Sequence, residues 1–283
     1  MSGVGSAYAI QRATLPLTAQ YAAAAYFAYI MLSTAAPGEP AYNVDARTLT
    51  EVYHHSLNFF YINIGLDQLG LAPVPSVPEN PVGEALFNFV NAWSLLFLPL
   101  LATDRRARRV RRWPLQFVGV MLLTNVFFIL LLAQRAAPLP HPSGLSTAER
   151  TAASLSPHAA RRAAPRLAEA GAEEARIAQK LQDAEARWRP AGRALGAVCL
   201  FVGGMSVAWC AFARPEYGGL TTRLHVLVER FTEERVFYAF VVDAGLYGFW
   251  QAWVMRDVGA PRRFCAVPFI GQAVWLLQGR PSE

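Results

Sequence analysis

The chain is organised around residues 81–113, which read PVGEALFNFVNAWSLLFLPLLAT and then DRRARRVRRW. Pro81 near the start and the acid Glu84 just behind it are typical of the first turn of a helix. The apolar part continues for about twenty residues, which is long enough to cross a hydrocarbon layer of roughly 30 Å. It ends at Asp104 and a cluster of arginines that cannot follow it into lipid: Arg105, Arg106, Arg108, Arg109, Arg111 and Arg112. This stretch therefore predicts a membrane helix with a strongly basic end.

Three apolar segments carry polar side chains at helical spacing. Glu84, Asn88 and Asn91 fall at i, i+4 and i+7, so they line one face of the central helix. The other two sets are His54, His55, Asn58, Asn63 and Asp67 in residues 52–71, and Asp243, Tyr247 and Gln251 in residues 236–255. An unpaired ionisable group at membrane depth costs several kcal/mol. We therefore expect these groups to meet in the interior of a helix bundle, whereas Asp67 and Glu84 could also lie in the head-group zone.

The composition excludes an ordinary soluble domain. Of the 283 residues, 54% are hydrophobic and only 16% are charged. The formal net charge of +6 comes almost entirely from arginine, because Lys180 is the only lysine. Basic residues beside membrane spans set the topology and contact anionic head groups. The arginine cluster lies between two predicted spans, so we expect it to face lipid and expect no nucleic-acid partner.

We predict an all-α, polytopic membrane bundle of six or seven spans. An N-terminal tail (1–14) precedes the first part of the bundle (15–134), and the second part covers residues 194–283. The predicted spans lie at 15–34, 52–71, 81–103, 113–133, 194–213 and 236–255. A shorter segment at 264–278, interrupted by Pro268, is either a tilted seventh span or a re-entrant hairpin. In the fifth span, small residues predict close helix contacts: Gly196, Gly203, Gly204 and Ser206.

Two segments are predicted to lie outside the hydrocarbon layer. Residues 135–193 form an extramembrane insertion whose second half has a helical pattern, with Ile177, Leu181 and Trp188 near one face. For this insertion a solvated hairpin is favoured over a helix that docks on a partner. Residues 220–235 have apolar residues on one side and charges on the other, which is typical of an amphipathic helix lying in the membrane interface.

The orientation stays open at this level. If every predicted span crosses, the arginine cluster shares a side with residues 214–235, and the insertion and the turn at residues 256–263 lie opposite. The density of charge favours the arginine cluster as the cytoplasmic or stromal side, but the number of basic residues does not.

The polar residues of the spans leave four functions open. They could fix helix packing through interhelical hydrogen bonds, or line a pathway for a proton, an ion or a small metabolite. His54 or His55 could hold a haem or pigment, and His54, His55, Glu84 and Asp243 could form an acid–base site. No inverted repeat, Cys-x-x-Cys, His-x-x-x-His, Gly-x-Ser-x-Gly or phosphate-binding glycine loop is present in the sequence. We therefore assign no catalytic residue, no metal ligands and no particular cofactor, and we do not expect an enzyme.

Six phrases together resemble a known family. They are SLNFF at Ser56, PVGEALFNFVNAW at Pro81, LLTNVFF at Leu122, ARPEYGG at Ala213, FVVD at Phe240 and VPFIG at Val267. Their order and spacing are similar to those of an uncharacterised family of polytopic membrane proteins of cyanobacteria and of algal and plant plastids. The resemblance covers residues 56–275 without the insertion. It implies a compartment, a chloroplast thylakoid or inner envelope membrane, and no reaction.

The expected function follows from these features together. We expect a non-catalytic accessory, assembly or structural component of a complex in a photosynthetic membrane. Its expected partners are membrane lipids and other membrane-protein subunits. The alternative is a transporter or channel for a small ion or metabolite.

Overall fold

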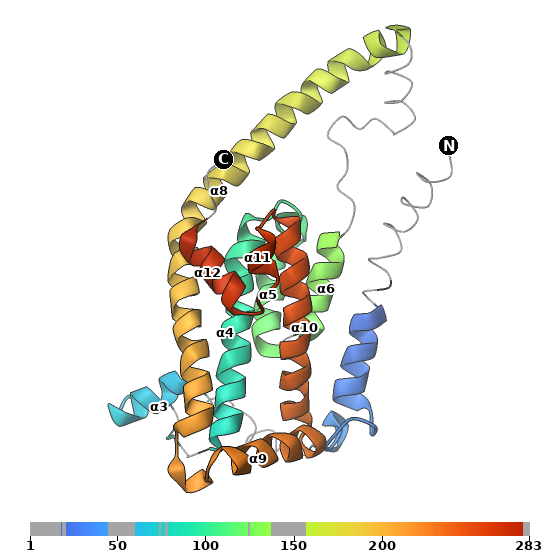
Figure 1. Ribbon diagram of the computed structural model, residues 1–283. Helices are drawn as coiled ribbons and strands as arrows, with labels where there is room; N and C mark the ends of the chain where they lie inside the picture. The colour runs from blue at the N-terminus through green and yellow to red at the C-terminus, as the bar shows by residue number, and fades with distance from the viewer. Residues whose placement is uncertain are drawn as a thin grey trace.

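The computed structural model describes residues 21–44, 60–73, 79–123, 125–136 and 157–279, together with residues 18, 75 and 76. Within this part of the chain every regular element is a helix and there is no strand, which confirms the all-α prediction (Figure 1). Two helices there are long and apolar enough to cross a membrane, α4 (Pro81–Thr103) and the segment Ala168–Phe212 of α8 (Pro157–Phe212). A bundle of six or seven spans stays a prediction.

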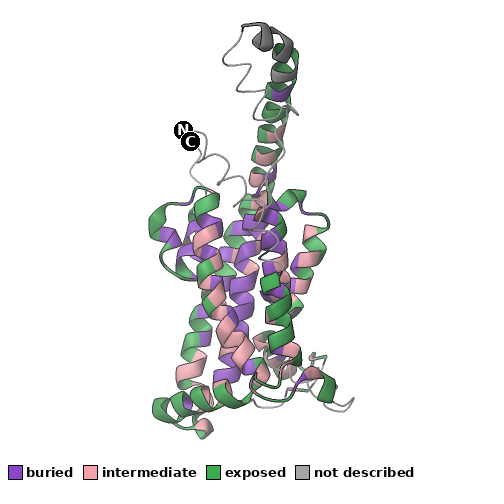
Figure 2. Ribbon diagram, turned by 90° about the vertical axis from the view of Figure 1, so that its right-hand side faces the viewer, coloured by how far each residue is buried: buried purple, intermediate pink, exposed green. Residues whose placement is uncertain are grey.

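The predicted central helix is α4, and it forms the core of the bundle. It begins as expected, with Pro81 in the first turn and the Asn80 side chain accepting a hydrogen bond from the Val82 N–H at 3.0 Å. It ends before Asp104. Most of its side chains are buried, and the buried residues follow the bundle axis (Figure 2). Its neighbours include α8, α5 (Trp113–Leu123), α10 (Arg235–Asp257) and α6 (Asn125–Ala136), the last through the Phe97–Phe128 ring contact at 4.6 Å.

The part of α8 that lies within the bundle, residues 190–212, has the opposite distribution of side chains from a helix of a soluble protein. Its inward positions carry small or polar side chains: Gly192, Gly196, Cys199, Gly203 and Ser206. Its outward positions carry large apolar ones: Val198, Phe201, Val207 and Phe212. A Cβ atom on Gly196 would lie 2.9 Å from the Ala273 carbonyl oxygen, and one on Gly203 would lie 2.3 Å from the Phe269 ring. The predicted close contacts are therefore confirmed at Gly196 and Gly203, whereas Gly204 faces open space.

The prediction of one span over residues 113–133 is wrong. The segment forms two short helices, α5 and α6, that lie side by side as a hairpin (Figure 1). The amides of Gln116 and Gln134 donate to each other at 3.2 Å, and Gly119 leaves room for the Phe127 ring. Both ends of the hairpin therefore lie at the same end of the bundle. An apolar run of this length suits either one full crossing or two half-crossings, so its hydropathy could not distinguish them.

Three other predicted spans have different outcomes. The structure contradicts one continuous helix over residues 52–71 and matches the re-entrant alternative for residues 264–278. It leaves residues 15–34 untested, because residues 15–17, 19 and 20 lie outside the described part. Residues 264–278 divide between α11 (Arg262–Cys265) and α12 (Ile270–Gln278), as in the re-entrant alternative. The nine residues of α12 cover only about 14 Å, so α12 cannot cross a bilayer. Of residues 52–71, the structure describes the short helix α3 (Tyr61–Gln68), which lies across the bundle axis (Figure 1). Of residues 15–34, it describes a helix at Tyr21–Leu32 that is shorter than a span.

The insertion and the fifth predicted span are parts of one helix. The 56 residues of α8 cover about 84 Å, and the N-terminal half projects beyond the bundle (Figure 1). The helical prediction for residues 167–188 is confirmed, because the helix is continuous from residue 157. The solvated hairpin predicted for the whole insertion, residues 135–193, stays a prediction. Residues 137–156 lie outside the described part. We call the part of α8 from residue 157 to residue 189 the projecting rod.

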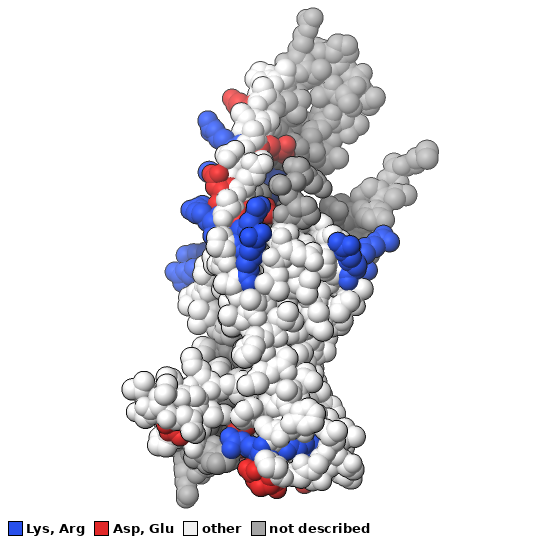
Figure 3. All heavy atoms as spheres, turned by 60° about the vertical axis from the view of Figure 1, so that its left-hand side comes forward, with Lys and Arg blue, Asp and Glu red and all other residues white. Residues whose placement is uncertain are grey.

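The two ends of the bundle differ in charge. At the end that bears the projecting rod lie the arginine cluster, with its single turn Ala107–Arg109, and the turn at residues 256–263. We call this the basic end. The opposite end is closed by α9 (Leu220–Glu233), the predicted amphipathic helix, which lies across the bundle (Figure 1). The prediction that the arginine cluster and residues 256–263 lie on opposite sides is thus wrong, because residues 113–133 turn back. Figure 3 shows many basic side chains at the upper end, with acidic ones among them along the rod, and a smaller group of both signs at the lower end.

Candidate functional site

The first polar cluster surrounds Glu84, which is 0% exposed. Arg214 donates to its carboxylate through Nη2 at 2.9 Å and through Nε at 3.2 Å, and the Trp209 indole donates at 2.6 Å. The hydrogen bonds to Glu84 raise the pKa of the Arg214 guanidinium above its ordinary value. Both oxygens of the carboxylate are therefore engaged in charge-assisted bonds, the strong kind in a dry environment.

The turn between α8 and α9 places Arg214 beside Glu84. Arg214 has a positive φ of 51°, and Gly218 follows with a φ of 80°. The buried guanidinium of Arg223 then donates to backbone carbonyls at the end of α8 and in the turn, including those of Cys210 and Gly218 at 2.9 Å each. The ARPEYGG phrase is thus a rigid turn that presents one arginine to the bundle. Sequence reasoning missed Arg214 and Arg223 as site residues, because arginines at a helix end are usually solvated.

The other amides of the central stripe have structural partners. The Asn88 amide donates to the Glu84 carbonyl at 2.7 Å and accepts from the Tyr61 N–H at 3.3 Å. The Asn91 amide donates to the Phe87 carbonyl, on its own helix, at 2.8 Å. All three stripe residues are buried, as predicted. Their described partners outside α4 lie on α3, on α8 and in the turn after α8.

Replacing Asn88 by leucine is expected to lower the free energy of unfolding by about 0.5–2 kcal/mol, the scale of interhelical polar contacts in membrane proteins. The change removes the bond that ties α4 to the start of α3. The measurement is a denaturant titration of the purified protein in detergent. Asn91→Leu is the matched control, because the Asn91 amide donates to a carbonyl of its own helix, α4. Equal losses in the two variants would contradict this role of Asn88.

A second cluster lies at the tip of the α5–α6 hairpin. Asn125 is fully buried and donates to the Asp243 carboxylate at 2.7 Å, and Tyr26 donates to the same oxygen at 2.7 Å. The Trp250 indole donates in turn to the Asn125 side-chain oxygen at 2.8 Å. The hairpin, α10 and the N-terminal helix are therefore joined at one carboxylate. Asp243 was predicted to lie in the interior, which is confirmed; its partners were not predicted.

The remaining predicted stripe residues are placed as follows. His54, His55 and Asn58 lie outside the described residues, so the haem, pigment and acid–base alternatives are untested. Asn63 is buried on α3, and Asp67 is half-buried near its end. Gln251 is fully buried.

Gln251 fastens the turn between α11 and α12. Its side-chain oxygen accepts from the Trp93 indole at 3.0 Å and from the Phe269 N–H at 2.8 Å. Its nitrogen donates to the Val267 carbonyl at 2.9 Å. Phe269 has a positive φ of 59°, a strained conformation that these bonds hold. The VPFIG phrase is therefore a structural turn, and Gln251 is its anchor.

A further cluster closes the basic end. Arg135 lies at the end of α6 and is 1% exposed. It forms an ion pair with Asp104, which follows α4. It forms a second ion pair, at 2.9 Å, with Asp257, the last residue of α10. Arg106 bonds Asp257 from the other side at 3.0 Å. Arg135 and Asp257 were not predicted as site residues. That these two residues lie at the same end of the bundle follows only once residues 113–133 are known to form a hairpin.

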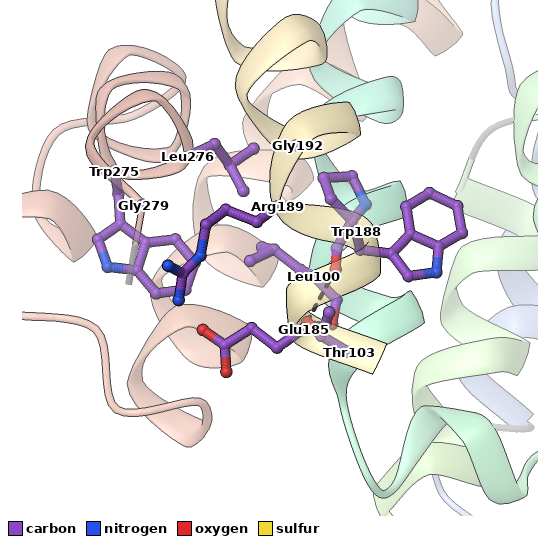
Figure 4. Close-up of a pocket in the computed structure, with 10 residues that line it drawn as sticks. Leu100, Thr103, Glu185, Trp188, Arg189, Gly192, Trp275, Leu276 and Gly279 are labelled. Atoms are coloured by element: carbon purple, nitrogen blue, oxygen red, sulfur yellow. Dashed lines mark hydrogen bonds between the residues drawn. The ribbon is translucent and has the colours of Figure 1, made fainter. Parts of the chain in front are cut away.

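A groove with a volume of about 40 Å³ lies between α8, α4 and α12. Figure 4 shows Arg189 of α8 beside Leu100 and Trp275, with the Trp188 ring turned to the other side. Small-molecule sites usually enclose about 300–1,000 Å³. Among the described residues, moreover, no group of three His, Cys, Asp or Glu side chains is placed to hold a metal ion. The described geometry therefore favours packing over ligand binding for these clusters.

The chain was compared with known proteins in three ways. No protein-family model, no curated protein and no solved structure matches it. The family resemblance of the six phrases stays a prediction.

Proposed function

We propose that this chain is a membrane-embedded, non-catalytic accessory or assembly component that holds the projecting rod against other subunits of a complex. The observation that carries the proposal is the large number of apolar side chains that face outward, while α8 turns small and polar side chains inward. Phe201, at 70% exposed, and Leu122, at 76%, are examples from two different helices. The resemblance of the six phrases supports a photosynthetic membrane as the compartment.

The exposed apolar surface has the height of a bilayer. On α8 it extends over residues 194–212, which carry no charge and cover about 28 Å. Further exposed apolar side chains lie on α5, α10 and α12: Leu115, Val118, Leu122, Phe249 and Ile270. A soluble monomer rarely exposes a continuous apolar surface of this size. This belt supports embedding in lipid, with α9 at one interface.

The distribution of charge supports an orientation. At the α9 end the arginines are tied down: Arg214 to Glu84, Arg230 to Glu234, and Arg235 to the carbonyls of Ile30 and Ser33. At the basic end most arginines are exposed. Because basic residues concentrate on the side from which insertion starts, we infer that the basic end faces the cytoplasm or stroma. The projecting rod then lies in that compartment.

The rod supports a docking role. Its exposed side chains are mostly charged or small, and Glu173, Arg176, Lys180 and Asp183 lie on one face of it at i, i+3, i+7 and i+10. A charged helix that projects beyond its own bundle is suited to contact another domain or subunit. The buried polar clusters, in contrast, are occupied by contacts between the bundle's own helices, which supports a structural function for them.

The first test is whether the protein is integral to the membrane. Alkaline carbonate is expected to leave the full-length chain in the membrane pellet, because the apolar belt is held by burial in lipid and not by charge. Release into the supernatant would overturn the membrane-embedded bundle.

The second test is purification in mild detergent. The intact chain is expected to bring membrane-complex subunits in fixed ratio, and a variant lacking residues 160–177 is expected to lose them. This deletion removes about five full helical turns, so the side chains of the remaining rod keep their directions relative to the bundle. A control of equal length, with residues 160–177 replaced by a designed Glu/Lys/Ala helix, separates the length of the rod from its surface. A lone chain that is thermally stabilised by a small solute would instead support a transporter, with the Asp243–Asn125 contact as its starting point.

A further inference from the structure

The turn between α10 and α11 at the basic end contains two arginines that have no counter-charge. Arg256 and Arg262 are exposed and line one open hollow together with Ala260. Among the described residues neither guanidinium group makes a hydrogen bond or an ion pair. The nearest acid in the sequence, Asp257, is already bonded to Arg135 and Arg106. The hollow therefore presents positive charge only.

Three other arginines at the basic end have partners within the protein. Arg106 and Arg135 share Asp257, and Arg108 donates to the Lys180 carbonyl at 3.4 Å. The two positive charges at the hollow repel each other. An anion bound between them would be attracted to both, and this attraction would offset the repulsion. Guanidinium groups bind phosphate oxygens in a bidentate manner, so a phosphate fits this hollow best.

The position of the hollow along the bundle axis indicates that the phosphate belongs to a lipid head group. Phe249, at 63% exposed, lies seven residues before Arg256 on α10, about 10 Å deeper in the bundle. Val267 and Ile270 are exposed just after the hollow. On α5, Leu115 is likewise exposed directly after Arg111 and Arg112. Arginines one or two turns above an apolar belt lie where phospholipid head groups lie.

We propose that the hollow lined by Arg256 and Arg262 binds the phosphate of an acidic phospholipid head group in the leaflet at the basic end. The proposal rests on the membrane embedding argued above and assigns to it a specific lipid class. It also gives the turn at residues 256–263, which the sequence placed apart from the arginine cluster, a role beside that cluster.

The test compares the unfolding midpoint of the full-length protein in nanodiscs of phosphatidylcholine alone and of phosphatidylcholine with phosphatidylglycerol. The acidic lipid is expected to raise the midpoint, and added salt is expected to reduce the rise. In the Arg256→Gln/Arg262→Gln variant most of the rise is expected to vanish, because losing two arginines weakens attraction to an acidic surface by about tenfold or more. The control is Arg176→Gln/Arg187→Gln on the projecting rod, which loses the same charge and is expected to keep the rise.

Three outcomes would overturn the proposal. They are a full rise in the double variant, an equal loss in the control, or the same stabilisation by inorganic phosphate in phosphatidylcholine nanodiscs. The last would identify a free anion as the ligand. None of them affects the carbonate test, so a failure of the lipid site is distinguishable from a failure of membrane embedding.

Discussion

Replacing Glu84 by alanine is expected to lower the free energy of unfolding by about 3–5 kcal/mol, because it leaves a partly buried guanidinium without its carboxylate. Arg214, whose side chain is 17% exposed, would lose two hydrogen bonds, and the Trp209 indole would lose its acceptor. The measurement is the midpoint of a denaturant titration in detergent, followed by tryptophan fluorescence. Trp209 packs against Tyr61 at a ring distance of 5.1 Å and contributes to the emission of the seven tryptophans, which reports on unfolding of the bundle as a whole.

Two further variants show that the loss comes from the pair. Arg230→Ala removes the surface pair with Glu234, at 3.5 Å, and is expected to cost less than about 1 kcal/mol. Combining Glu84→Leu with Arg214→Leu removes both charges and is expected to restore part of the stability, because no unpaired charge remains. If Glu84→Ala lowers the free energy of unfolding by no more than Arg230→Ala does, the ion pair of Glu84 is not shielded from water as described above.

The central helix could be predicted from the sequence because its limits are set locally. Asn80 and Pro81 begin α4, and the charge of Asp104 ends it. The inward direction of Glu84, Asn88 and Asn91 also follows from their spacing and from the absence of hydrogen-bond partners in lipid. Such local and energetic rules determined which side chains are buried.

The partners of the buried groups could not be predicted, because they depend on how many times the chain crosses. Asn125 lies near the middle of residues 113–133, where a single span would place it in the interior as one isolated amide. In the structure it begins α6 and meets Asp243 at the tip of a hairpin. The same reversal brings Arg135 back to Asp104. Hydropathy measures the cost of burying a segment, and this cost is nearly the same for one span and for two half-spans.

The hairpin was also the source of the error in topology. With a crossing at residues 113–133, the arginine cluster and the rod lie on opposite sides, and no end of the protein is clearly basic. With a reversal there, both lie together, and the α9 end keeps arginines that are neutralised by Glu84, by Glu234 or by backbone carbonyls. Because residues 113–133 were predicted to cross the membrane, the difference in charge between the two ends of the bundle could not be recognised from the sequence.

Replacing Arg135 by leucine is expected to cost about 3–5 kcal/mol of stability, because two aspartates at the basic end then lose their shared cation. Arg135 is 1% exposed and contacts the last turns of two helices through Asp104 and Asp257. Its guanidinium also lies 5.8 Å from the centre of the Trp253 ring. The loss is measured by the same denaturant titration.

A double-mutant cycle between Arg135→Leu and Asp104→Asn tests the hairpin itself. If residues 113–133 turn back, the two residues are in contact and a coupling energy of about 0.5–3 kcal/mol is expected. If the segment crosses the bilayer, they lie roughly 30 Å apart on opposite sides, and their effects add within about 0.5 kcal/mol. Arg135→Leu with Asp67→Asn is the control pair, because Asp67 lies on α3, far from the basic end (Figure 1). Coupling in the first pair and additivity in the control would locate both ends of residues 113–133 at one face of the membrane, and with them the rod, the arginine cluster and the proposed lipid site.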